Sequence, residues 1–171
     1  SGAIAIMYFI TYFAYSFYGL IPNLVAFALM FVFTIFTVFT ALKYDKQIIA
    51  HIGLFGAYAV PILLSDGSGK VEILFSYMAI INFGILVLSF KKYWKSLFYA
   101  AFGLTWIIVI GWYIDSFDPK IHFNLASTFI SIFFATFYVC FLAYKILKKE
   151  QFSFSNIVIL LLNSFIFYGL G

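Results

Sequence analysis

Two carboxylates and one imidazole lie close together in the segment 115–122, as Asp115, Asp118 and His122. Such a set could hold a divalent metal ion or take part in acid–base chemistry. The same residues also have a structural interpretation, because Asp118 before Pro119 is typical of a helix N-cap followed by a first-turn proline. Asp115 would then simply end the preceding helix. A membrane enzyme acting at the outer face would require the three side chains to converge.

Other residue types that carry chemistry are scarce. The sequence contains no metal-spaced cysteine pair, no Gly-rich phosphate loop and no serine elbow, and Cys140 is its single cysteine. Glu72 is the acid that lies closest to the interior of an apolar run, and we expect it in the first turn of a helix at the membrane interface. We therefore predict that the chain is not an enzyme and that it binds no cofactor and no metal.

Polar uncharged residues give a stronger pattern. Tyr8, Tyr12, Tyr15 and Tyr18 recur at steps of four, three and three, which places their hydroxyl groups along one face of a helix. These hydroxyl groups could line a polar cavity. They could equally form hydrogen bonds between helices, with Tyr18 in the aromatic belt.

Further polar residues occur inside other apolar runs. Thr34, Thr37 and Thr40 form a similar stripe, although a threonine hydroxyl can also bond the preceding turn of its own helix. Asn82 and Asn163 are costlier to bury and are better candidates for polar contacts at membrane depth. For these asparagines too, contacts that hold helices together compete with a transport path as the interpretation.

One apolar run contains residues that alter the helix backbone, namely Gly53, Gly56 and Pro61. Small residues allow neighbouring helices to approach closely, and a proline frees a carbonyl group and bends the helix. We therefore expect a central, kinked helix at this position. Kinked helices often line transport sites, but they also occur in many other bundles.

The elements that position these residues follow from composition. Of 171 residues, 65% are hydrophobic and only 9% are charged, whereas soluble globular chains carry about 25% charged residues. Intrinsic disorder, a disulfide scaffold and a nucleic-acid module are excluded by this apolar content. The chain is therefore predicted to be an integral membrane protein.

Seven apolar runs are separated by clusters of turn-forming or charged residues. Each run approaches the length of about 20 residues that a helix needs to cross a bilayer, and none shows the alternating polarity of a barrel strand. We predict an all-α, polytopic transmembrane bundle of about seven spans. The runs cover approximately residues 3–19, 24–42, 48–64, 71–90, 96–114, 123–144 and 152–169.

Lysine placement predicts the orientation. The second, fourth and sixth connections carry eight of the ten lysines, and the first, third and fifth carry only Lys70 and Lys120. Because positive charge is retained on the cytoplasmic side, we expect the start of the chain to be cytoplasmic and its end to lie outside. Each basic connection holds at most three lysines, fewer than the four to eight that suggest specific binding of anionic lipids. The net charge of +4 thus needs no nucleic-acid partner.

The chain begins with Ser1 and ends in apolar sequence at Gly171. We therefore expect residues 1–171 to be a single transmembrane region that is a fragment of a longer multi-pass protein. Any soluble module would lie beyond its ends.

The stretch from Gly56 to Pro61, followed by Ser65 and the turn at 66–69, resembles the signature of the bacterial membrane protein family called domain of unknown function 2339. The resemblance extends through Tyr77, Asn82, Gly84, Trp94, Thr105-Trp106 and Gly111-Trp112. It implies a longer parent chain with many more membrane helices. It implies no established activity and transfers no catalytic residue.

Two functions remain open. One is a transport or envelope-assembly role in the bacterial inner membrane, with polar-striped helices that line a path for an amphipathic or uncharged substrate. The alternative is a membrane scaffold or anchor that holds partner proteins without transport or catalysis. In both cases the expected partners are the lipid bilayer and either further helices of the same parent chain or partner membrane proteins.

Overall fold

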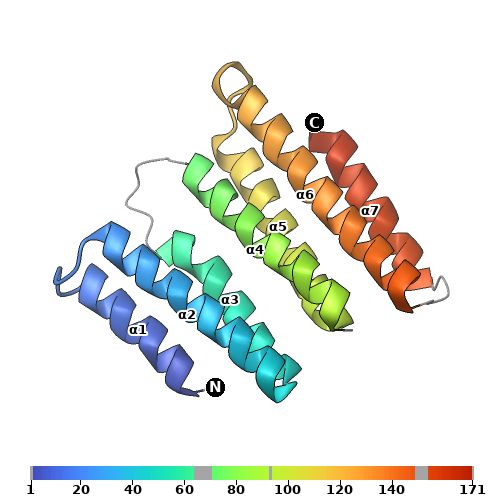
Figure 1. The fold of residues 1–171 in the computed structure, drawn as a ribbon. Helices are drawn as coiled ribbons and strands as arrows, with labels where there is room; N and C mark the ends of the chain where they lie inside the picture. The colour runs from blue at the N-terminus through green and yellow to red at the C-terminus, as the bar shows by residue number, and fades with distance from the viewer. Residues whose placement is uncertain (1, 64–70, 93, 149–153, 171) are drawn as a thin grey trace. The chain divides into compact units, whose positions relative to one another are not determined.

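The computed structural model describes residues 2–63, 71–92, 94–148 and 154–170, and this part of the chain is entirely helical apart from its connections (Figure 1). Each of the seven apolar runs predicted from the sequence corresponds to one helix. The predicted separator at 66–70 and residues 149–151 of the one at 145–151 lie outside the described residues. The helices are α1 (Gly2–Ser16), α2 (Asn23–Tyr44), α3 (Gln47–Leu63), α4 (Val71–Lys91), α5 (Lys95–Ser116), α6 (Pro119–Lys148) and α7 (Phe154–Leu170).

Four of these helices are long and apolar enough to cross a membrane. They are α4 and α5 in full, together with the parts Leu24–Tyr44 of α2 and Pro119–Ala143 of α6. The other three, α1, α3 and α7, are apolar but have only 15, 17 and 17 residues. At about 1.5 Å per residue these three reach about 22–26 Å, which is less than the hydrocarbon thickness of about 30 Å.

Helix ends follow local backbone chemistry. α1 ends at Ser16, before the predicted limit at 19, because Gly19 takes a left-handed conformation (φ 57°) that closes the helix. α2 ends at Tyr44, and the φ of 53° at Asp45 lets the N–H groups of Asp45 and Lys46 bond the carbonyl oxygens of Leu42 and Ala41, respectively. This pair of bonds is a Schellman motif, and it allows α3 to begin at Gln47.

The chain divides into two compact units, Ser1–Val71 and Glu72–Gly171, here called unit 1 and unit 2. In unit 1, α2 contacts both α1 and α3. The buried residues of α2 recur at steps of three or four and are mostly small, so that neighbouring helices can approach closely. They are Ala26, Met30, Thr34, Thr37 and Ala41.

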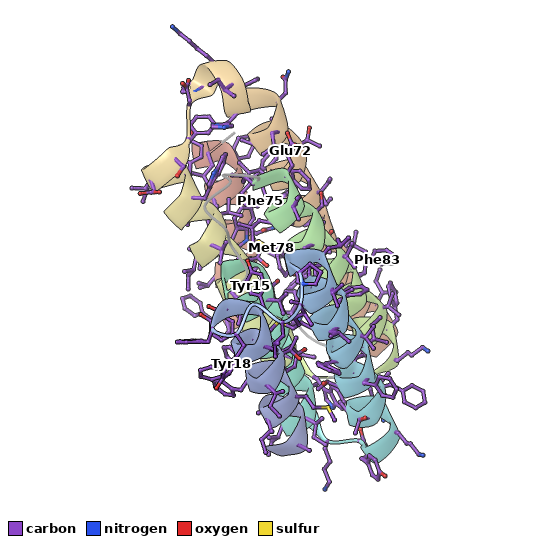
Figure 2. The ribbon with its side chains drawn as sticks, turned by 90° about the vertical axis from the view of Figure 1, so that its left-hand side faces the viewer. Tyr15, Tyr18, Glu72, Phe75, Met78 and Phe83 are labelled. Carbon is purple, nitrogen blue, oxygen red and sulfur yellow. The ribbon has the colours of Figure 1, made fainter. Side chains whose placement is uncertain are left out.

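Unit 2 packs around aromatic side chains. Phe75 of α4 makes edge-to-face contacts with Trp112 of α5 and Phe133 of α6, at centroid distances of 5.0 and 6.0 Å. Phe75 and Met78 are fully buried, whereas Phe83 on the same helix is 62% exposed (Figure 2). The inner face of α4 is thus defined by helical periodicity, and its exposed apolar face suits contact with lipid.

Candidate functional site

The predicted cluster spans the end of α5 and the start of α6, and its members have separate structural roles. Asp118 caps α6, since its Oδ1 accepts the N–H of Lys120 at 2.9 Å, as the sequence predicted. The N–H of Asp118 donates to Nδ1 of His122 at 3.1 Å, and the Oδ2 of Asp115 accepts the hydroxyl group of Ser116 at 2.7 Å.

These contacts do not assemble a metal site. Among the described residues, no three or more His, Cys, Asp or Glu side chains are grouped so that they could hold a metal ion. The imidazole of His122 instead packs edge-to-face on Trp112, with ring centroids 5.5 Å apart. Asp115, Asp118 and His122 are thus not grouped as a metal site in this segment, and the absence of enzyme activity stays a prediction.

Three of the four tyrosines that were predicted to share one helical face lie on one face of α1. Tyr8, Tyr12 and Tyr15 are half-buried on one face of the helix, which also carries the buried Thr11. Tyr18 was predicted on the same helical face, but this prediction is wrong because α1 ends at Ser16. Tyr18 lies in the following turn and is 73% exposed (Figure 2).

Tyr8 makes the central polar contact of unit 1. Its hydroxyl group lies 2.6 Å from Oγ1 of Thr34 in α2. Because the single proton of the Thr34 hydroxyl group is directed to the carbonyl oxygen of Met30 at 3.0 Å, Tyr8 is the donor to Thr34. Thr37 likewise donates to the carbonyl oxygen of Phe33 at 2.7 Å. Two members of the threonine stripe, Thr34 and Thr37, thus bond their own helix, as one sequence interpretation stated, and Thr34 also joins α1 to α2.

The glycines of α3 are positions of close helix approach. A Cβ atom added at Gly53 would lie 2.6 Å from Cγ2 of Thr37, and one at Gly56 would lie 3.0 Å from ring atoms of Tyr8. α2 therefore approaches α3 closely at Gly53, and α1 approaches it closely at Gly56. This confirms that small residues allow close helix approach here. α3 continues through Pro61 to Leu63. The predicted kink at Pro61 stays a prediction.

Asn82 of α4 forms the central polar contact of unit 2. Its Nδ2 donates to Oγ1 of Thr105 at 3.0 Å, and the Thr105 hydroxyl group lies 3.2 Å from Oδ1 of Asn82 and 2.8 Å from the carbonyl oxygen of Ala101. Both Asn82 and Thr105 are fully buried. The amide thus joins α4 to α5 at membrane depth, where an unsatisfied polar group would cost several kcal/mol.

Asn163 of α7 bonds the backbone of α6. Its Nδ2 donates to the carbonyl oxygen of Phe134 at 3.2 Å, next to a stacked contact between Phe134 and Phe167 with centroids 4.6 Å apart. One heptad earlier, the Oδ1 of Asn156 accepts the hydroxyl group of Tyr99 in α5 at 3.4 Å. Both asparagines are buried. The two amide groups lie on one face of α7 and hold this helix against α6 and α5.

Sequence reasoning missed three of these side chains, Thr105, Asn156 and Tyr99. Asn156 carried a usable signal, because it precedes Asn163 by seven residues and so shares its helical face. Thr105 carried none by itself, since a threonine in an apolar helix most often bonds its own preceding turn. Its pairing with Asn82 depends on how α4 and α5 pack.

The candidate residues are thus divided between the two units. In unit 1, Tyr8 and Gly53 contact α2 and Gly56 contacts α1, while in unit 2 Asn82 contacts α5 and Asn163 contacts α6. Tyr8, Asn82 and Asn163 each direct a polar group to another helix, whereas Thr37 bonds the backbone of its own helix. Long apolar helices with polar contacts between them define an all-helical integral membrane protein.

Comparison with known proteins specifies the family. The profile described as "Predicted membrane protein (DUF2339)" matches residues 1–169, and the chain belongs to this family. The match confirms the resemblance seen in the sequence and extends it over both units. No curated protein and no solved structure matches the chain significantly.

Proposed function

We propose that this protein is an integral membrane scaffold or anchor, without catalysis or a cofactor, whose polar residues hold helices together. One observation supports this role above all: Tyr8 and Asn82, two of the candidates for a path, bond Thr34 and Thr105 on neighbouring helices. Groups committed to such bonds contribute about 0.6 kcal/mol each on average to helix association in membranes. The same groups are not free to bind a passing solute.

A transport role would require the polar side chains that line the path to be in contact with water. Tyr12 and Tyr15 are half-buried and share the face of Tyr8, so they are the residues through which a path along α1 would run. A scaffold makes the opposite prediction, that the groups at these contacts are reached by neither water nor a water-soluble reagent.

Cysteine accessibility separates the two roles. In a Cys140→Ala background, Thr34→Cys, Tyr12→Cys and Asn82→Cys are each reconstituted in vesicles and treated with a water-soluble maleimide. The exposed Ser116→Cys is the positive control. For a scaffold, the three membrane-depth positions react only after denaturation, while Ser116→Cys reacts in the folded protein.

Fold integrity is checked by circular dichroism, so that reaction of an unfolded variant is not counted. Labelling of folded Asn82→Cys or Tyr12→Cys at a rate near that of Ser116→Cys would establish a water-filled path and refute the scaffold.

We further propose seven spans in a bacterial inner membrane, with the start of the chain cytoplasmic and its end outside. The lysines support this orientation, and the short helices α1, α3 and α7 would cross by local thinning of the bilayer, at fractions of a kcal/mol per Å. An impermeant maleimide applied to intact cells should label Ser116→Cys but not Lys46→Cys. The reverse pattern would overturn the orientation.

A further inference from the structure

Charge is segregated in unit 2. Because α4, α5 and α6 are joined by short connections and alternate in direction, the end of α4, the start of α5 and the end of α6 lie at the same end of the unit (Figure 1). The described acids of the unit, Glu72, Asp115 and Asp118, lie near the opposite helix ends. The first end, called the basic end below, carries Lys91, Lys92, Lys95 and Lys145.

Two of these lysines act on each other although they are about fifty residues apart in the sequence. Partial burial lowers the pKa of the Lys145 ammonium group, and the nearby positive charge of Lys95 lowers it further. The Nζ of Lys145 also lies 5.6 Å from the ring centroid of Phe141. The fourth and sixth connections therefore contribute to one patch of positive charge.

We propose that the basic end of unit 2 binds the phosphate group of an anionic phospholipid. Clusters of four to eight lysines or arginines beside membrane helices favour anionic lipid headgroups. Each connection taken separately falls below this number, and the fold brings the two together. Apolar surface for acyl chains lies beside the charge, since Phe90 is 50% and Ile146 is 72% exposed. A phospholipid satisfies both features, whereas a soluble phosphate satisfies only the first.

This site is independent of the scaffold role. The test uses the full chain, purified in non-ionic detergent and delipidated, then titrated with phosphatidylglycerol, phosphatidylcholine or sodium phosphate. Bound lipid is counted by native mass spectrometry. We expect phosphatidylglycerol to bind at least tenfold more tightly than phosphatidylcholine, and millimolar phosphate to leave it bound.

Variants locate the site. Each lysine near the headgroup changes affinity about fivefold, so Lys95→Gln with Lys145→Gln should weaken phosphatidylglycerol binding about 30-fold. Lys95→Arg with Lys145→Arg should retain it. Lys120→Gln, at the opposite end of the unit, is the matched control and should bind as the wild type does. If the double variant does not fold, the single variant Lys145→Gln replaces it in the test, and its affinity for phosphatidylglycerol should fall about fivefold.

Three results would overturn the proposal. Equal binding of the two lipids would remove the preference for anionic headgroups. An equal loss in Lys120→Gln would show unspecific charge attraction. Displacement of phosphatidylglycerol by millimolar phosphate would identify a site for a free phosphate group instead of a lipid.

Discussion

Replacement of Gly53 by alanine tests the close packing of α3 on α2. The new Cβ atom would lie 2.6 Å from Cγ2 of Thr37, about 0.8 Å inside the 3.4 Å at which ordinary contact begins. Thr37 cannot easily turn away, because its side chain is buried and its hydroxyl group bonds the carbonyl oxygen of Phe33. The helices must therefore separate.

The expected cost combines two opposing terms. Overpacking in a close-packed contact costs about 1–3 kcal/mol, while alanine in a helix is favoured over glycine by about 0.5–1 kcal/mol. We therefore expect Gly53→Ala to lower the free energy of unfolding by about 1–2 kcal/mol. Gly103→Ala is the matched control, since nothing lies within 4 Å of its added Cβ atom, and it should be neutral or stabilising.

The assay is reversible unfolding of the full chain by sodium dodecyl sulfate in mixed micelles, followed by circular dichroism. Thr37→Ser removes the clashing Cγ2 atom but keeps the hydroxyl group, so it should restore at least half of the stability lost in Gly53→Ala. The reasoning fails if Gly53→Ala is as stable as the wild type, or if Thr37→Ser restores nothing.

Two further predictions concern single hydrogen bonds. Tyr8→Phe removes the donor to Thr34 and should lower stability by about 0.6 kcal/mol and at most about 1.7 kcal/mol in the same assay; no change would show that this bond contributes nothing. Asp118→Ala removes the cap of α6 and should cost about 1 kcal/mol. Asp115→Ala, which loses only an exposed bond to Ser116, should stay within about 0.5 kcal/mol of the wild type. Equal effects of the two aspartate variants would argue against the cap.

Local features could be predicted from the sequence because the interacting groups are close in the chain. The N-cap at Asp118 was predicted from its position before Pro119, and its bond reaches only two residues, to Lys120. The end of α1 was predicted too late, because periodicity continues through Tyr18 while Gly19 already takes a left-handed conformation. Hydrophobicity locates a helix better than it locates the end of that helix.

Partners of the buried polar groups could not be predicted in the same way. Asn82 could have bonded any neighbouring helix, and its partner Thr105 is 23 residues away. The partner of Asn163 is a backbone carbonyl group, at Phe134, that no side-chain pattern can indicate. Each choice depends on which helices pack together and on how they are rotated.

The sequence alone determined that this chain is a helical membrane protein, because 9% charged residues cannot solvate a soluble surface. It also determined the positions of the apolar runs, since hydrophobicity and turn chemistry are properties of neighbouring residues. Tertiary structure alone decided that Tyr8, Asn82 and Asn163 bond other helices and that the lysines of two connections lie at one basic end. These facts depend on distances between residues far apart in the sequence, which only packing of the helices fixes.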